Sequence, residues 1–414
     1  MTAAEALRVN GTRLWDTIMT SASIGPGRTA TGLRRLALTD ADREMRDVFA
    51  RWCRDAGLSI TVDRMGNMFA RRAGADDALP PVLIGSHLDT QIAGGRYDGI
   101  LGVLAGLEVV RTLNDAGVRT RRPIEIVNWT NEEGARFSPP MLGSAVWAGV
   151  RTLAWAHARV DDAGCTVGEE LERIGYAGDA AVGGRAVDAY FELHIEQGPM
   201  LDDKGIPVGV VAGTYGVRGM AVEVRGETAH AGPTPMAARR NALVGAAMLI
   251  VAVNEIGFAA APDGKATASR IEVWPNLTGI LPDWAKVMVD VRHPDAATVE
   301  RMVADVRRAM RECSQRAQVE MEIVETWQFG AERFDPELVS LIRRTAERLG
   351  APSLDLPSQA GHDAYYVSRV APTAMIFTPC ERGISHNENE HTRLEDALPG
   401  VNVLLHAVLE RANR

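Results

Sequence analysis

Short apolar runs alternate with helically spaced apolar positions over the first two hundred residues. Helical spacing predicts helices over 40–53 and 100–116. Runs of β type predict strands at 58–63, 67–71, 82–86, 124–129 and 190–195. This alternation is typical of an α/β fold, in which helices cover both faces of a mainly parallel or mixed sheet.

The pattern changes between about 208 and 326, where the order β-α-β-β-α-β predicts a small ferredoxin-like sandwich. Its expected strands are 208–212, 219–225, 271–274, 285–291 and 319–324, and its helices are 237–255 and 296–314. A helix at 335–349, a strand at 373–378 and a helix at 395–412 follow. We therefore expect a discontinuous larger domain, 1–213 and 327–414, with an inserted α+β domain at 214–326.

Composition narrows the class of protein. A chain of 414 residues exceeds what one core normally serves, which also favours two domains. The net charge of −9, without a basic block, argues against nucleic acid as a partner. The longest apolar stretch, 242–253, is too short to span a bilayer. Four cysteines without C-x-x-C spacing and an N-terminus unlike a signal peptide predict a cytoplasmic protein.

Histidines and carboxylates follow several of the predicted strands and turns. They are His87, Asp98, Glu132, Glu133, His194 and His386. Ligands of α/β sheets belong at the carboxyl ends of strands. Imidazole and carboxylate suit borderline divalent metals, and two such ions roughly 3.5–4 Å apart can polarise a carbonyl and activate water. The residue types therefore predict a hydrolytic site with two metal ions.

The ligands divide between two ions. Asp98 is the best bridging carboxylate, because glycines on both sides let its short side chain approach both ions. We expect His87 and His194 to bind one ion with Asp98, and Glu133 and His386 to bind the other.

Two further carboxylates have expected roles beside the ions. Glu132 is the candidate general base, because consecutive side chains point in different directions. Asp89 is expected to accept the second ring N–H of His87 and so fix its tautomer. His391 lies close enough to His386 in the sequence to be a competing ligand.

Seven motifs resemble the dinuclear-metal amidohydrolases related to aminoacylases and carboxypeptidase-type exopeptidases. The nearest branch holds N-carbamoyl-L-amino-acid hydrolases, β-ureidopropionases and allantoate amidohydrolases. The resemblance implies a metal-bearing mixed-sheet α/β catalytic domain with an inserted lid that also forms a homodimer. The motifs are Gly85-Ser-His-Leu-Asp-Thr90, Gly95-Arg-Tyr-Asp-Gly99, Asn131-Glu-Glu-Gly134, His194-Ile-Glu-Gln-Gly198, His230-Ala-Gly-Pro-Thr-Pro-Met236, Gly361-His-Asp363 and Gly383-Ile-Ser-His386.

The same resemblance implies substrate contacts. Arg292 matches the arginine that grips the substrate carboxylate, for which a planar guanidinium is suited. Asn276 and Gln197 match amide contacts to the substrate, while Arg218 and Gly361 match further contacts. His230 matches a lid histidine that stabilises the oxyanion and that can come from the partner subunit. One position departs from the family, since relatives usually carry aspartate where this chain has Asn241.

These observations predict hydrolysis of an N-carbamoyl amino acid, N-carbamoyl-β-alanine included, to amino acid, carbon dioxide and ammonia. Allantoate is the nearest alternative substrate. A peptidase or acylamino-acid hydrolase, and a scaffold without catalysis, are further alternatives. Zn²⁺ is the first expectation for the two ions, and the same ligands accept Mn²⁺, Co²⁺ or Ni²⁺.

Overall fold

The computed structural model describes residues 6–414. They form two compact units: one runs up to Ala212 and resumes at Phe334–Arg414, and the other is Gly213–Arg333. The sequence places the return to the first domain at 327, earlier than the structure, because the last strand of the second unit continues to Phe329. Residues 1–5, on which part of the signal-peptide expectation rests, lie outside the described residues.

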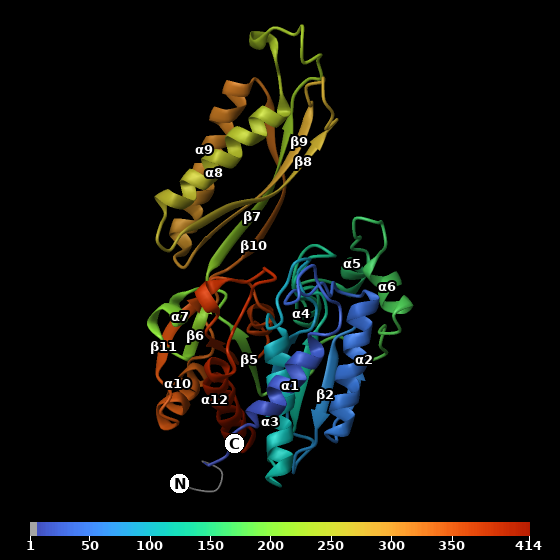
Figure 1. The fold of residues 1–414 in the computed structure, drawn as a ribbon, viewed down its shortest axis with the longest axis vertical. Coiled ribbons are helices and arrows are strands. Elements are labelled where there is room, and N and C mark those ends of the chain that lie inside the picture. The colour runs from blue at the N-terminus through green and yellow to red at the C-terminus, as the bar shows by residue number, and fades with distance from the viewer. Residues whose placement is uncertain (1–5) are drawn as a thin grey trace. The chain divides into compact units, whose positions relative to one another are not determined.

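An eight-stranded mixed sheet forms the centre of the first unit (Figure 1). The four central strands β4, β3, β5 and β12 are parallel, and strands on both sides join them in antiparallel pairs. Parallel strands that are covered on both faces are apolar throughout, and β3, β4, β5 and β12 are fully buried. In sheet order, the strands are β1 (Ser59–Val62), β2 (Met68–Arg72), β4 (Ile124–Trp129), β3 (Val82–His87), β5 (Ala189–Ile195), β12 (Thr373–Thr378), β6 (Val208–Thr214) and β11 (Ser353–Ser358).

Helices cover both faces of this sheet. Gly400 in α12 lies against Leu193 of β5, whereas the N–H of Ala364 in α11 donates to the neighbouring Glu192. Consecutive strand residues point to opposite faces, so α12 and α11 lie on opposite sides. The helices of the unit are α1 (Gly11–Ser21), α2 (Asp40–Asp55), α3 (Ile100–Asp115), α4 (Leu142–Trp147), α5 (Leu153–His157), α6 (Val167–Arg173), α7 (Met200–Lys204), α10 (Pro336–Arg348), α11 (Asp363–Val367) and α12 (Leu394–Ala412), with the 3₁₀ turn η2 (Glu381–Gly383).

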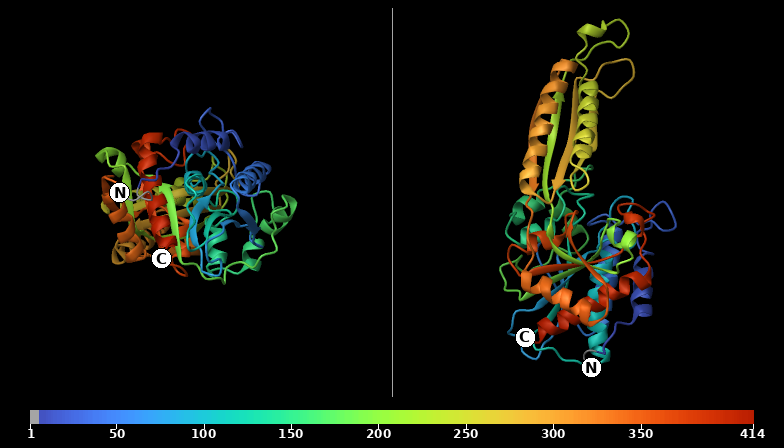
Figure 2. Two further views of the ribbon diagram at one scale, coloured as in Figure 1. Left: turned by 90° about the horizontal axis from the view of Figure 1, so that it is seen from below. Right: turned by 90° about the vertical axis from the view of Figure 1, so that its left-hand side faces the viewer.

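The second unit is a four-stranded antiparallel sheet with the order β10-β7-β9-β8. Its two long helices lie side by side on one face of the sheet (Figure 2). The predicted β-α-β-β-α-β order and the predicted combination of α/β and α+β parts are confirmed, but the strand expected at 208–212 is β6, which belongs to the sheet of the first unit. The elements are β7 (Gly216–Arg225), η1 (Met236–Ala238), α8 (Ala242–Ala259), β8 (Lys265–Trp274), β9 (Trp284–His293), α9 (Ala296–Ala317) and β10 (Glu320–Phe329).

Helix α8 extends the predicted apolar stretch to eighteen residues. Within residues 6–414 it is the one helix long and apolar enough to cross a membrane, by length and composition only. One side of α8, including Ala246, Leu249 and Val253, is buried in the core of the second unit. A core helix of a globular domain passes the same test of length and composition, so α8 is weak evidence for a membrane span.

Several elements escape prediction because their apolar pattern is weak. The exposed edge strand β8 begins at Lys265 rather than at 271. Its first six residues, Lys265-Ala-Thr-Ala-Ser-Arg270, show little alternation of apolar and polar positions. Helices α4 to α7 have seven residues or fewer. Such short elements form through their packing against the sheet, which local periodicity does not record.

Candidate metal centre

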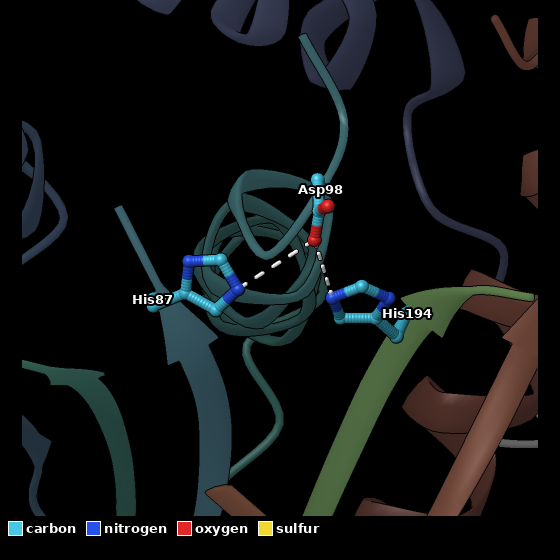
Figure 3. A group of neighbouring side chains, drawn as sticks. All are labelled: His87, Asp98 and His194. Atoms are coloured by element: carbon cyan, nitrogen blue, oxygen red, sulfur yellow. Dashed lines mark ion pairs between the residues drawn. The ribbon is translucent and has the colours of Figure 1, made fainter. Parts of the chain in front are cut away.

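Three side chains from separate elements converge above the carboxyl ends of β3 and β5. His87 ends β3, His194 lies near the end of β5, and Asp98 precedes α3. Figure 3 shows both imidazoles turned toward the Asp98 carboxylate. The Nε2 atoms of His194 and His87 lie 3.0 and 3.6 Å from Oδ1 of Asp98. The strand ends therefore deliver two nitrogen donors to one carboxylate oxygen.

A second group shares the same aspartate. Nε2 of His386, in the loop after β12, lies 3.4 Å from Oδ2 of Asp98 and 3.3 Å from Oε2 of Glu133. In each group, His87-Asp98-His194 and Asp98-Glu133-His386, the donor atoms lie within 4.8 Å of one another. Among the described residues His391 belongs to neither group. The mixed nitrogen and oxygen donors fit divalent transition metals.

Backbone carbonyls select the ring nitrogens that can bind metal. Nδ1 of His87 lies 2.9 Å from the carbonyl oxygen of Asp89, and Nδ1 of His194 lies 2.9 Å from that of Ile195. A carbonyl only accepts hydrogen bonds, so each Nδ1 carries the proton and donates. In the neutral rings Nε2 carries no proton, as a metal ligand requires, and in His194 it accepts the N–H of Gly99 at 3.0 Å.

The expected contact of the Asp89 carboxylate with His87 needs correction. Oδ1 of Asp89 is 3.9 Å from Nδ1 of His87, because the turn after β3 brings the Asp89 carbonyl against the ring instead. The carboxylate accepts the N–H groups of Glu132 and Glu133 at 3.3 and 3.2 Å. The side chain of Asp89 therefore orients the backbone of the two glutamates, and the backbone carbonyl of Asp89 orients the His87 ring.

Gly99 permits the close approach of Asp98 and His87. Its φ is +68°, and a Cβ at this position would lie 2.3 Å from the His87 ring. Any side chain would therefore clash with the imidazole as well as strain the backbone.

The surroundings of the three carboxylates separate their pKa values. Burial and the nearby Asp363 raise the pKa of Glu132 well above its ordinary value. Burial and Asp98 do the same to the pKa of Glu133. Burial also acts on Asp98, but the neighbouring His194 and His87 outweigh it and hold its pKa well below the ordinary value. Asp98 is thus the member of the cluster that loses its proton most readily.

Gln197 and His362 line the same cluster. The amide nitrogen of Gln197 donates to Oδ2 of Asp98 at 2.9 Å, while its amide oxygen is buried without a hydrogen-bond partner among residues 6–414. The His362 ring lies 4.4 Å from that of His194, and its Nε2 likewise lacks a described partner. Sequence reasoning assigns no role to His362, although its exposed neighbour Gly361 is an expected substrate contact.

The second unit carries the remaining candidates at its two ends. The loop with His230 bridges Ile280, close to the exposed Asn276, beyond the end of β9 that begins at Trp284. Arg292 lies at the other end of β9, where Asp290 accepts two hydrogen bonds from its guanidinium at 3.1 Å each.

Arg218 lies near Arg292 on the neighbouring strand but faces the other side of the sheet. Arg218 pairs with Val291, the residue before Arg292, and forms an ion pair with Glu300 of α9 at 2.8 Å. One copy of this unit therefore does not gather the four lid candidates, Arg218, His230, Asn276 and Arg292, around one point.

An α/β domain with buried imidazole and carboxylate groups at its strand ends is the architecture of a metal-dependent hydrolase. The chain belongs to the peptidase family M20/M25/M40, whose profile matches residues 83–410. It is 47% identical to an N-carbamoyl-L-amino-acid amidohydrolase of Rhizobium meliloti, over 99% of this chain and 98% of the relative. It is 31% identical to allantoate deiminase 1 of Glycine max, over 89% and 83%.

A solved structure shares the whole architecture. The crystal structure of an amidase of the hydantoinase/carbamoylase family from Burkholderia vietnamiensis superposes with a TM-score of 0.95 at 47% identity, covering 99% of both chains. Both compact units are thus present in a solved relative.

Proposed function

We propose that this protein hydrolyses the ureido C–N bond of an N-carbamoyl amino acid, releasing the amino acid, carbon dioxide and ammonia. The observation that carries the proposal is the division of one buried carboxylate, Asp98, between two imidazole-containing groups. Two divalent ions, Zn²⁺ first among Zn²⁺, Mn²⁺, Co²⁺ and Ni²⁺, would be held there by His87, His194, Glu133, His386 and the shared Asp98. When bound, such ions polarise a carbonyl and lower the pKa of water.

Glu132 would move the proton. Its Oε2 lies 3.4 Å from Nε2 of His87, at the edge of the first donor group, and only 7% of the residue is exposed. Burial raises its pKa, which suits a carboxylate that takes a proton from water and returns it to the leaving nitrogen near neutral pH.

Polar groups with free hydrogen-bonding capacity would hold the ureido end of the substrate. The buried amide oxygen of Gln197 lacks a partner among the described residues and can accept a ureido N–H. Gly361 would offer close approach for the substrate beside the cluster.

The lid residues would bind the rest of the substrate. Arg292 would pair with the substrate carboxylate, while Asn276 and Arg218 would add hydrogen bonds. His230 would donate to the oxygen that gains negative charge in the transition state.

Strand length supports a homodimer in which two lids serve one site. From Trp284 to Arg292 strand β9 takes eight steps, or roughly 26 Å at ~3.3 Å each. His230 and Asn276 lie beyond the first end of the strand, and Arg292 lies at the second end. One lid therefore cannot present all three to one small molecule. An exposed apolar side of α8, which includes Val251 and the 76% exposed Phe258, offers a surface for a second copy.

Allantoate is the second candidate substrate, since it is also a ureido-bearing carboxylate and the chain resembles an allantoate deiminase. A peptidase or acylamino-acid hydrolase is a weaker candidate, because the histidine at 194 and Gln197 are typical of the carbamoyl branch. The four cysteines, all free thiols, suit the cytoplasmic location that we expect.

The test is ammonia release by the metal-reconstituted protein. The panel contains N-carbamoyl-β-alanine, several N-carbamoyl-L-amino acids, allantoate, N-acetyl amino acids and dipeptides, the last two scored by free amine. We expect turnover of one N-carbamoyl class, abolished by EDTA. Turnover of allantoate alone would select the second candidate, and cleavage of only acetyl or peptide substrates would contradict both.

A further inference from the structure

Glu390 is a buried carboxylate that the proposed chemistry leaves unused. It is 2% exposed, and its Oε1 accepts the backbone N–H groups of Tyr97 and Asp98, each at 3.1 Å. A Cβ on Gly95 would lie 2.3 Å from the same oxygen. The loop that carries Asp98 is therefore wrapped closely around Glu390.

Ser385 connects Glu390 to the Asp98 side chain. Its hydroxyl lies 2.9 Å from Oε2 of Glu390 and 3.1 Å from Oδ2 of Asp98. The amide nitrogen of Gln197 lies 2.9 Å from that Oδ2 and 3.0 Å from the Ser385 hydroxyl. Ser385 and Gln197 thus meet at one oxygen of Asp98, and Ser385 links that oxygen to Glu390.

The orientation of Asp98 decides whether it can serve two ions. Oδ1 faces His194 at 3.0 Å and Oδ2 faces His386 at 3.4 Å. The terminal torsion of an aspartate is broad, so the rotamer alone does not fix this division. Hydrogen bonds to Oδ2 and to the Asp98 backbone supply the missing restraint.

We propose that Glu390 and Ser385 are positioning residues that hold Asp98 with one oxygen toward each donor group. The proposal rests on the proposed metal centre. Glu390 fixes the backbone of Asp98, and Ser385 fixes the rotation of its carboxylate. Because Ser385 directly precedes His386, the same contacts tie the second donor group to the shared aspartate.

The test is Zn²⁺ titration of the metal-free full-length protein, with thermal unfolding of the same metal-free samples. Residues that orient metal ligands typically change affinity by roughly 10- to 100-fold. We expect that loss in Glu390→Ala and in Ser385→Ala. Glu390→Gln should stay within a few-fold of the parent, because its amide oxygen can still accept the two N–H groups.

Glu108→Ala is the matched control. Glu108 is equally buried and accepts the backbone N–H of Asn10 at 3.0 Å, but it belongs to neither donor group. It should lower the unfolding temperature and leave Zn²⁺ affinity unchanged.

Parental Zn²⁺ affinity and stoichiometry in both alanine variants would overturn the proposal, whatever happens to their unfolding temperatures. If Glu390→Ala does not fold, Ser385→Ala decides alone, because it keeps the contact of Glu390 with the Asp98 backbone. Zn²⁺ titration needs no substrate, so its result stands apart from any failure to hydrolyse N-carbamoyl amino acids.

Discussion

Glu132 and Glu133 are neighbours in the chain but meet different partners. Glu133 accepts hydrogen bonds from the Gln91 backbone and amide at 3.1 and 2.8 Å and lies beside His386, whereas Glu132 lies beside His87. The two N–H bonds from their backbone to Asp89 keep this separation in place. At the residue scale, two backbone contacts with one aspartate therefore direct two adjacent carboxylates to different partners.

The Glu132→Gln variant should keep its metal and lose turnover. An amide has the same shape as the carboxylate but cannot take and return a proton. General acid–base catalysis typically contributes about 10²- to 10⁴-fold, and we expect a fall in kcat of that size. Ammonia release and metal content by mass spectrometry measure the two effects. Glu125→Gln, in a buried carboxylate of β4, is the control, and normal turnover by Glu132→Gln would remove the base role.

The Arg292→Ala variant should bind carboxylate substrates weakly. A hydrogen bond to a charged group contributes roughly 1.5–3 kcal/mol, so KM should rise about 10- to 100-fold with little change in kcat. Arg270→Ala, on the exposed edge strand of the same sheet, should leave both constants unchanged. Parental KM values for Arg292→Ala would exclude this arginine as the carboxylate contact.

Asn241 shows how a departure from the family can be absorbed locally. Its side chain accepts the N–H groups of Leu243 and Val244 at 3.0 and 3.3 Å and so caps α8. Asparagine and aspartate are about equally good in this position. Asn241 therefore retains the N-terminal cap of α8, because either residue type can cap a helix from this position.

At the element scale, the candidate ligands lie where strands give way to turns. The end of β3, the loop after β4 and the end of β5 meet at one edge because these strands are parallel neighbours. Strand positions could be predicted from apolar runs, and with them this edge. The loop after β12 could be placed only through the β12–β5 pairing, which joins distant parts of the chain.

The turn before α3 offers a sharp test of packing. Gly99→Ala should disrupt the His87 ring position and lower metal affinity, because its Cβ would lie 2.3 Å from that ring. Gly117→Ala is the matched control, since Gly117 also has a positive φ, +62°, but open space around it. Both should lose about 1 kcal/mol of stability from backbone strain. Equal metal affinity in the two variants would contradict the steric role of Gly99.

The stability of the whole molecule should change with pH in opposite directions with and without bound metal. Burial raises the pKa of Asp89 to about 6 and that of Glu390 to about 8, and burial raises the pKa of Glu132 and Glu133 well above ordinary values. The folded metal-free protein then binds more protons than the unfolded chain, and this difference stabilises the fold at low pH. The stabilisation is lost as pH rises through the folded pKa values. His362, whose pKa is lowered by burial, acts in the opposite sense.

We expect the metal-free protein to unfold at a lower temperature at pH 8 than at pH 5. Metal ligands must be deprotonated, so added Zn²⁺ should stabilise the protein more at pH 8. Thermal unfolding in EDTA and in Zn²⁺ across this range measures both trends. An unfolding temperature in EDTA that is constant or rises with pH would contradict the proton balance.

Mixed dimers test whether the lid of one subunit completes the site of the other. We expect Glu132→Gln subunits and His230→Ala subunits to be inactive alone. Their heterodimer would hold one site with both residues intact if His230 acts across the dimer. Activity should then recover to about half the parental value per dimer, one of its two sites. A mixed dimer of one Glu132→Gln subunit and one Glu133→Gln subunit is the control. Both changes lie in the first unit, so these subunits cannot complement each other. No recovery with His230→Ala would place His230 in its own subunit.

The sequence by itself determined the fold class, the inserted unit and the strand ends at which histidines and carboxylates gather, because apolar periodicity and glycine turns are local. Only the tertiary structure decided which oxygen of Asp98 faces which histidine, that the Asp89 carbonyl rather than its carboxylate meets His87, and that Glu390 supports Asp98. The last contact joins residues 292 positions apart. Side chains so distant in the chain meet only when the sheet has assembled, and their hydrogen bonds leave no pattern in the sequence around either partner.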